Sequence, residues 1–446
     1  MEGNTAEKRV LIITYYWPPS GGSGVQRWLK FSKYLPQFGW KPIIYTPENP
    51  DFGIQDQTLL SDISKEAEVI KRPIWEPYSI YRMVTGNKDK SANFGGSTAK
   101  GGSSLTGKLA AWIRGNFFIP DPRVFWKNPS IKYLSNYLKH NPVDVIVTTG
   151  PPHSMHLIGL GLKRKFPNIS WVADMRDPWS TFDIHNSFLS ASAKKKNAAF
   201  EKQVLDTADA VVMVSPSLKD EFQPFDHKKE WLISNGFDRE DFKTIEPIKP
   251  EKFSIYHSGL FNFIRNPENL WIALEELCTE NQNFAYDLDI QLIGTVDSQV
   301  MEAISKYPVL KSKVTERGWM QHDDIIKENN KAAVLMLVVN NSRNAKAQLT
   351  GKFFEYLALE KPIFAICPDD ADVANAIKAT NTGFACNFEE KDRIKSVVNT
   401  LYQDWKNNAS FSGNKDKIEA YERKNLSQQL AKKMEDLIFS PPIAKH

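Results

Sequence analysis

A helix expected to begin near residue 350 carries side chains suited to holding an anion. Thr350, Gly351 and Lys352 stand at its start, and Glu355 follows one turn later. A diphosphate at this end would meet free backbone N–H groups, the helix dipole and an ammonium together, while Glu355 could accept hydrogen bonds from a ribose. A capping box would explain the threonine and the acid. It would not explain Lys352, because a cation in the first turn opposes the dipole.

A glycine loop follows the first apolar run of the chain. Gly21, Gly22 and Gly24 separate that run from a helical pattern. In open α/β sheets ligands bind where strands end, and glycines let them approach the backbone. A nicotinamide-dependent oxidoreductase would use this loop with Glu48 as its ribose acid. That alternative is disfavoured because Arg27 occupies the place of the third glycine in the dinucleotide fingerprint, and because the second half has its own anion site.

Polar residues follow two later strand-like runs. His153 comes directly after one of them, where it could act on a ligand or could have a purely structural role. His156 is the weaker candidate because it falls on the following helix. Arg176 and Asp177 follow the next run, where they could bind the hydroxyl groups of a ligand or form an internal ion pair.

Composition excludes several classes of protein. The chain has 57 Lys and Arg residues and 53 Asp and Glu residues, a net charge of +4. This charge is too small for a dedicated nucleic-acid binder. The 3 cysteines have no metal-ligand spacing, and no acidic pair follows a plausible donor strand, so we expect no metal and no cofactor. The longest apolar run, 332–339, falls well short of the ~20 residues of a bilayer span. We therefore expect a cytoplasmic protein, which could also associate with the inner face of the membrane.

Strand-like and helical patterns alternate along the chain, which predicts parallel α/β sheets. The strand-like runs are 10–16, 42–46, 143–149, 170–173, 210–214 and 230–233, then 253–257, 289–293, 334–339 and 362–366. A proline-bearing stretch near residue 247 divides them into two series. We expect an N-terminal domain over 1–245, a second domain over 246–420, and a last helix within 421–446 that returns to the first domain. Residues 85–107 have a loop-like composition, and the aromatic segment after them suits either a packed helix or a membrane-facing surface.

The order of these motifs resembles the retaining GT-B glycosyltransferases of family four. The resemblance is carried by Pro18-Pro19 with the glycine loop, by Ala208–Ser215 followed by Asn235-Gly236-Phe237-Asp238 and Phe242, by His257-Ser258-Gly259 with Arg265, by Gly294, and by Thr350–Glu355 with Lys361-Pro362. It implies two Rossmann-like domains that face each other across a cleft. It also implies transfer of a sugar, with retention and without a metal, from a nucleotide-diphosphate sugar to a glycan or lipid-linked acceptor in polysaccharide or cell-surface glycan synthesis.

The resemblance also assigns roles to residues. The catalytic set is His153, Arg265 and Lys352, the donor set is Gly259, Gly294, Thr350, Gly351 and Glu355, and the acceptor set is Gly21, Gly22, Gly24, Arg176 and Asp177. Two positions depart from the family: Ala347 replaces the acid that contacts the donor sugar, and Leu260 replaces an arginine. A non-catalytic nucleotide-sugar-binding protein and a nucleotide-sugar 2-epimerase of the same fold therefore remain alternatives.

Overall fold

The computed structural model describes residues 7–51, 55–77, 112–113, 115–181, 189–226 and 229–439. These residues form two compact units, 1–234 with 423–446 and 235–422. The first unit ends at Ser234, earlier than the expected boundary at 245, because Phe237 pairs with Glu422 and packs in the core of the second unit. The loop expected over residues 85–107 lies outside the described residues.

The first unit contains a parallel sheet of seven strands in the order β3-β2-β1-β4-β5-β6-β7. They are β1 (Lys8–Ile13), β2 (Trp40–Pro47), β3 (Glu68–Arg72), β4 (Val145–Gly150), β5 (Ser170–Met175), β6 (Ala210–Met213) and β7 (Glu230–Leu232). In the register, Leu11 lies between Ile43 and Ile146, and all three side chains are buried. Continuous apolar strands of this kind are expected where helices cover both faces of a sheet.

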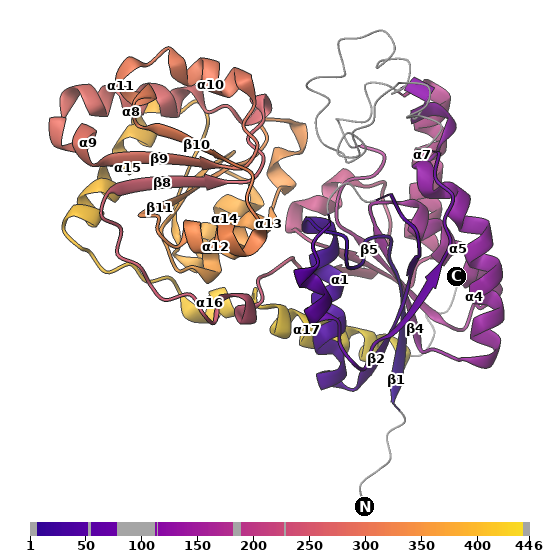
Figure 1. Ribbon diagram of the computed structural model, residues 1–446. Coiled ribbons are helices and arrows are strands. Elements are labelled where there is room, and N and C mark those ends of the chain that lie inside the picture. Colours follow the sequence, from indigo (N-terminus) through magenta and orange to yellow (C-terminus); the bar gives the residue numbers. More distant parts are fainter. Residues whose placement is uncertain are drawn as a thin grey trace, which may run out of the picture. The chain divides into compact units, whose positions relative to one another are not determined.

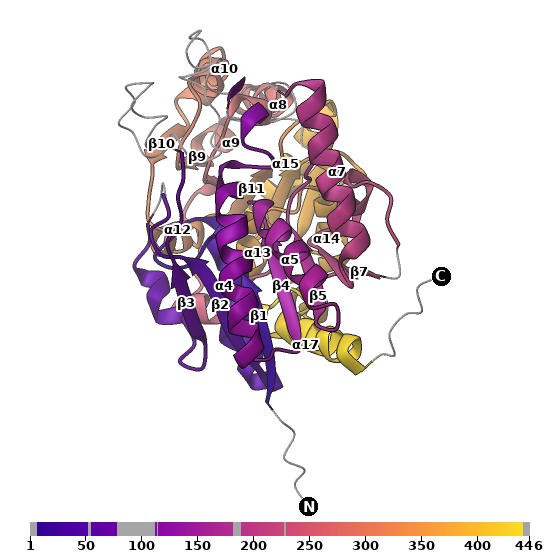
Figure 2. The ribbon, with the colours of Figure 1, turned by 90° about the vertical axis from the view of Figure 1, so that its right-hand side faces the viewer.

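Helices cover both faces of this first sheet (Figure 1). The helices are α1 (Ser23–Tyr34), α4 (Lys127–His140), α5 (Ser154–Lys165), α7 (Ala191–Thr207) and α17 (Arg423–Phe439). Figure 2 shows α4, α5 and α7 together on one face. Helices α1 and α17, labelled in Figure 1, pack against each other on the other face. Leu426 and Leu430 of α17 are buried in the core that also contains Trp28 of α1.

The second unit contains a parallel sheet of six strands in the order β10-β9-β8-β11-β12-β13. The strands are β8 (Phe253–Ser258), β9 (Leu288–Ile293), β10 (Val314–Gly318), β11 (Val334–Val338), β12 (Ile363–Ile366) and β13 (Gly383–Cys386). The helices are α8 (Glu268–Glu280), α9 (Gln282–Asp287), α10 (Ser298–Ser305), α11 (Pro308–Lys311), α12 (His322–Asn329), α13 (Gly351–Ala358), α14 (Asp372–Thr380), α15 (Lys391–Lys406) and α16 (Lys415–Glu419).

In the second unit α8, α10 and α11 lie on one face of the sheet and α12, α13 and α14 on the other (Figure 1). The side chains between these layers form one buried core, to which every strand except the partly exposed β10 contributes fully buried residues. No helix among the described residues combines the length and apolarity needed to cross a lipid bilayer.

Candidate functional site

Three glycine turns follow neighbouring strands of the second sheet. Gly259, Gly294 and Gly318 have φ angles of +95°, +118° and +69°, a region that favours glycine. The Gly259 amide donates to the Ile293 carbonyl at 2.7 Å, and the Gly294 amide to the Gly318 carbonyl at 2.7 Å. A Cβ atom on Gly294 would lie 2.6 Å from the Gly259 carbonyl oxygen. The carboxyl ends of β8, β9 and β10 therefore present a tightly packed surface of backbone.

The Lys352 side chain lies directly over the first of these turns. A Cβ on Gly259 would lie 2.6 Å from Lys352 Cε, so the absence of a side chain there makes room for the lysine. Lys352 Nζ is 3.2 Å from Nε2 of the buried His257, whose Nδ1 is 3.1 Å from the Met336 carbonyl oxygen. A carbonyl only accepts, so Nδ1 carries the proton and Nε2 accepts from the lysine. Burial and the nearby Arg265 lower the pKa of Lys352 to about 7.

Arg265 supplies a second cation and is held by groups around it. It ends the 3₁₀ helix Phe263–Arg265, and its Nε donates to Asn340 Oδ1 at 2.7 Å. Its Nη1 donates to the carbonyl of Leu260 at 2.7 Å. Burial lowers the pKa of Arg265, and burial with the charges of Lys352 and Arg265 lowers that of His257 well below its usual value. Two partly buried cations, of which Arg265 disfavours the charge of Lys352, are a suitable environment for an anion.

The amino end of α13 is open. Thr350 is the N-cap residue, but its side chain caps no backbone N–H, and Oγ1 is buried without a hydrogen-bond partner. A Cβ on the exposed Gly351 would meet no atom within 4 Å. The capping-box alternative is therefore not observed, and the first N–H groups of the helix are left without a side-chain cap.

Glu355 makes an ion pair that the sequence does not predict. Its Oε1 lies 2.9 Å from Nε2 of His322, the first residue of α12. Burial lowers the pKa of His322, but the hydrogen bond and charge of Glu355, helped by Asp241 and Asp323, raise it overall to about 9. His322 is therefore charged at neutral pH. The second unit thus brings Lys352, Arg265 and the Glu355 pair to one end of its sheet.

The glycine loop of the first unit is braced by Arg176. Its guanidinium donates to the carbonyls of Gly24 at 2.8 Å and Gly150 at 3.2 Å, and also to that of Pro151. These bonds tie the first turn of α1 to the end of β4 and the residue after it. They show that Arg176 has a structural role, and its contact with acceptor hydroxyl groups stays a prediction. Asp177 is exposed.

Two of the loop glycines have steric reasons to be glycine. Gly22 has a φ of +85° and precedes α1 as its N-cap residue without a side-chain hydrogen bond. A Cβ on Gly24 would lie 2.9 Å from a ring carbon of Tyr16. Gly21 is buried beside them. The loop therefore leaves the start of α1 without a side-chain cap, as at α13.

Arg27 has a structural role behind this loop. Its guanidinium pairs with Asp174 at 2.8 Å, and both side chains are almost fully buried, at 1% and 0% exposure. Asp174 also accepts from Trp28 Nε1 at 2.7 Å and Thr149 Oγ1 at 2.8 Å. A large paired side chain at this position differs from the close helix–strand packing that the third glycine of a dinucleotide fingerprint allows.

His153 and His156 differ in their surroundings. His153 is half-buried at the end of β4 and stacks on Trp179, with ring centroids 4.6 Å apart and an angle of 3°. His156 is fully buried, and its Nδ1 lies 2.9 Å from Thr148 Oγ1. Burial lowers the pKa of His156 to about 3, so it is neutral. Of the two, only His153 is accessible to a ligand.

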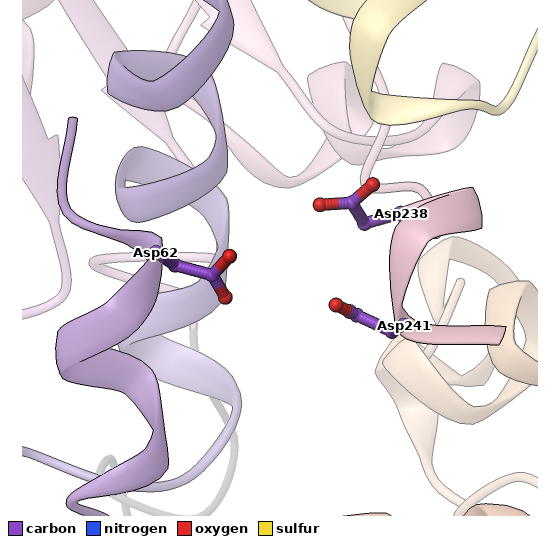
Figure 3. Close-up of side chains that lie close together, drawn as sticks. All are labelled: Asp62, Asp238 and Asp241. Carbon is purple, nitrogen blue, oxygen red and sulfur yellow. The ribbon is translucent and has the colours of Figure 1, made fainter. Parts of the chain in front are cut away.

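Three aspartates drawn in Figure 3 belong to different units. Asp62 is in the first unit, where it pairs with Lys30 at 2.8 Å and Lys33 at 2.7 Å. Asp238 and Asp241 are in the second unit, where Asp238 caps the 3₁₀ helix Arg239–Phe242. Within its own unit, then, Asp62 is neutralised by two lysines and Asp238 serves a helix start, so we assign them no metal.

No protein-family model and no curated protein matches this sequence. Solved structures do match it along nearly the whole chain. The N-terminal domain of a Candida albicans trehalose-6-phosphate phosphatase aligns with a TM-score of 0.62 at 11% identity, over 96% of this chain and 97% of that one. HepE of Anabaena, solved in complex with UDP-glucose, aligns with a TM-score of 0.59 at 13% identity, over 96% and 99%.

A third solved structure is WaaG, a glycosyltransferase involved in lipopolysaccharide biosynthesis. It aligns with a TM-score of 0.53 at 13% identity, over 97% of this chain and 100% of that one. Identities this low establish architecture and not activity. Together with the two parallel sheets and their flanking helices, they confirm the predicted fold class: the chain has the GT-B fold of glycosyltransferases.

Proposed function

We propose that the protein is a retaining glycosyltransferase whose second unit binds a nucleotide-diphosphate sugar and whose first unit binds the acceptor. The observation that carries this proposal is that two cationic side chains, Lys352 and Arg265, lie near each other beside the uncapped start of α13. Backbone N–H groups, the helix dipole and two cations converge there, and the open space at Gly351 admits a ligand to the backbone. The fold shared with HepE, solved with UDP-glucose, supports a donor of this class.

In the proposed reaction the bond between the anomeric carbon and the diphosphate oxygen breaks. The leaving nucleoside diphosphate gains negative charge, which Lys352, Arg265 and the first amides of α13 stabilise; such preorganised stabilisation is usually the largest catalytic contribution. The acceptor hydroxyl oxygen bonds to the same carbon from the same face, and its proton passes to the departing phosphate oxygen. These charges are supplied by side chains, so we propose that the reaction needs neither a metal nor a cofactor.

The proposed donor sugar is a hexose and the proposed acceptor a glycan or lipid-linked sugar. The similarity in fold to WaaG supports an acceptor on the route to a cell-surface polysaccharide. Ala347, in the 3₁₀ helix before α13, offers no carboxylate to the sugar, so the contacts with the hexose must come from other residues. Donor identity therefore has to be found by experiment.

The first test is a panel of nucleotide-sugars screened for thermal stabilisation, followed by a hydrolysis assay in EDTA. A ligand that binds the folded state raises the melting temperature. We expect one donor to stabilise the protein and to release its nucleoside diphosphate slowly without acceptor. Binding without release would favour the non-catalytic alternative, and conversion to an epimeric sugar would favour the epimerase.

We also propose that the first unit makes peripheral contact with a membrane. Trp75, Phe117 and Phe125 are 53%, 69% and 44% exposed, and the rings of Trp75 and Phe125 lie 4.8 Å apart. Aromatic rings suit the boundary between headgroups and acyl chains. Trp75→Ser with Phe125→Ser should lower co-sedimentation with anionic vesicles several-fold, whereas Trp319→Ser, at an exposed indole of the second unit, should not. If the Trp75→Ser, Phe125→Ser double variant and Trp319→Ser co-sedimented with the vesicles to the same extent, the result would contradict this contact.

Glu355→Ala should separate nucleoside recognition from diphosphate recognition. We expect the affinity for the nucleoside diphosphate to fall about 10- to 100-fold, the range for a lost hydrogen bond to a charged group. The affinity for free pyrophosphate should change by less than about threefold, since Lys352 and Arg265 remain. Calorimetric titration of both ligands measures the difference, with Glu302→Ala on the exposed face of α10 as the control. Equal losses for both ligands would contradict the ribose role.

His153→Ala should affect turnover more than donor binding. We place His153 near the reacting groups, so its removal is expected to lower kcat on the order of 100-fold, within the range of a catalytic side chain. The Kd of the donor should stay within about threefold of wild type, because the donor site lies in the second unit. His140→Ala, an exposed histidine on α4, is the matched control. Wild-type kcat in His153→Ala would remove this residue from the mechanism.

A further inference from the structure

We propose that His322 is a positioning residue for nucleoside recognition: it fixes one oxygen of Glu355 so that the other faces the ribose hydroxyls. This inference rests on the proposed function and deepens it. Nothing in the sequence around His322 indicates such a role. It follows from the packing of α12 beside α13 in the second unit.

The geometry of the pair leaves half of the carboxylate available. His322 Nε2 donates to Glu355 Oε1 at 2.9 Å. No other hydrogen bond or ion pair joins either oxygen of Glu355 to the described residues, so Oε2 can still accept. The two side chains are 31% and 28% exposed, so the pair is neither buried in the core nor loose on the surface. A free glutamate would sample several rotamers, and this contact selects one.

Charge explains why a histidine is suited to this place. Glu355 lies about one turn from Gly351, where the proposed diphosphate binds, and an unpaired carboxylate there would repel it. His322 begins α12, where the helix dipole disfavours a cation, so its charge depends on neighbouring acids. Glu355 at 2.9 Å and Asp323 at 3.9 Å provide that compensation. The pair therefore offers an acceptor to the ribose while adding no net charge beside the diphosphate.

The same ion pair could instead be a brace between α12 and α13 with no part in binding. The two roles differ in one measurable quantity, the ratio of Kd values for a 2′,3′-dideoxynucleoside diphosphate and its ribose parent. Diphosphate contacts cancel in this ratio, so it reports only on the hydroxyls. If the ion pair is only a brace, its loss would weaken the binding of both ligands equally and leave the ratio of Kd values unchanged.

The experiment measures this ratio by calorimetry with UDP, GDP or ADP, whichever stabilises the wild-type protein most, and its dideoxy analogue. We expect a ratio on the order of 10 to 100 for wild type. His322→Ala should bring it below about 3, and so should His322→Asn, whose amide is too short to reach Oε1; the Asn variant also serves if the Ala variant folds poorly. His322→Gln, which places a neutral N–H where Nε2 was, should restore the ratio.

The double variant supplies the control. In a Glu355→Ala background, His322→Ala should leave the ratio unchanged, because the carboxylate that it positions is gone. A wild-type ratio in both His322→Ala and His322→Asn would overturn the inference, as would equal weakening of both ligands. These results are distinct from failure of the proposed function, in which none of the three nucleoside diphosphates would bind the wild-type protein.

Discussion

Replacing Lys352 by methionine is expected to abolish most of the catalytic activity. Methionine keeps an unbranched stem over Gly259 but removes the cation that we propose faces the leaving diphosphate. Loss of one preorganised donor to a developing anion typically lowers kcat about 10²- to 10³-fold. The affinity for the nucleoside diphosphate should fall as well, by about 10- to 100-fold, since a hydrogen bond to a charged group is lost. Steady-state kinetics and calorimetry measure the two effects.

The pH dependence of binding tests the same residue independently. Lys352 has a pKa of about 7 in the free protein, and a bound diphosphate must raise it. Between those two values one proton is taken up on binding, so the Kd should increase by up to about tenfold per unit as the pH rises above 7. Lys352→Met should flatten this slope between pH 7 and 8.5.

Lys327→Met is the matched control for both experiments. Its side chain is 63% exposed on α12, where it pairs with Asp324, which is also exposed. It should leave kcat and the pH slope unchanged. Full activity in Lys352→Met, or an equal loss in Lys327→Met, would exclude the proposed diphosphate site.

The sequence predicts the buried strands of both sheets and misses exposed ones. Continuous apolar runs mark β1, β4, β8 and β11, which lie inside their sheets. The outer strand β7 is predicted, but β3 and β10, which are outer strands too, are not. Their residues are half-buried or exposed, as in Glu68–Arg72. An outer strand is covered less completely by helices, so it can lack an apolar run, and its pattern is then unclear.

The candidate site also contains some residues that the sequence predicts and others that it does not. Lys352 and Gly351 stand out in the sequence because a first-turn cation and a glycine are both unfavourable in an ordinary helix. His257 appears in the sequence only as part of the motif with Gly259 and Arg265, without a role of its own, and His322 has no signal at all. They become meaningful only because β8 and α12 bring them to within 3.2 Å of Lys352 and 2.9 Å of Glu355, residues distant in the chain. Arg176 shows a role that its type and position do not predict: its guanidinium donates to backbone carbonyls, whereas the sequence indicates only a ligand contact or an ion pair.

Gly351→Ala should stabilise the protein and at the same time weaken nucleoside diphosphate binding. A Cβ here meets nothing within 4 Å in the free protein, so the substitution causes no clash. Alanine is favoured over glycine within a helix by about 0.5–1 kcal/mol, so the melting temperature should rise or stay level. The methyl group fills the space through which a phosphate would approach the first amides of α13. We expect the affinity to fall about 10- to 100-fold, the equivalent of one or two weakened charged hydrogen bonds.

Opposite signs for stability and binding make Gly351→Ala a sharper test than a loss-of-charge variant, because general damage to the fold lowers both. Ser396→Ala, at an exposed position of α15, provides a matched gain in helix propensity away from the site. It should raise stability slightly and leave binding unchanged. If Gly351→Ala bound the nucleoside diphosphate as tightly as wild type, the ligand would not contact the start of α13. The two cations would then have to bind the diphosphate from a different direction.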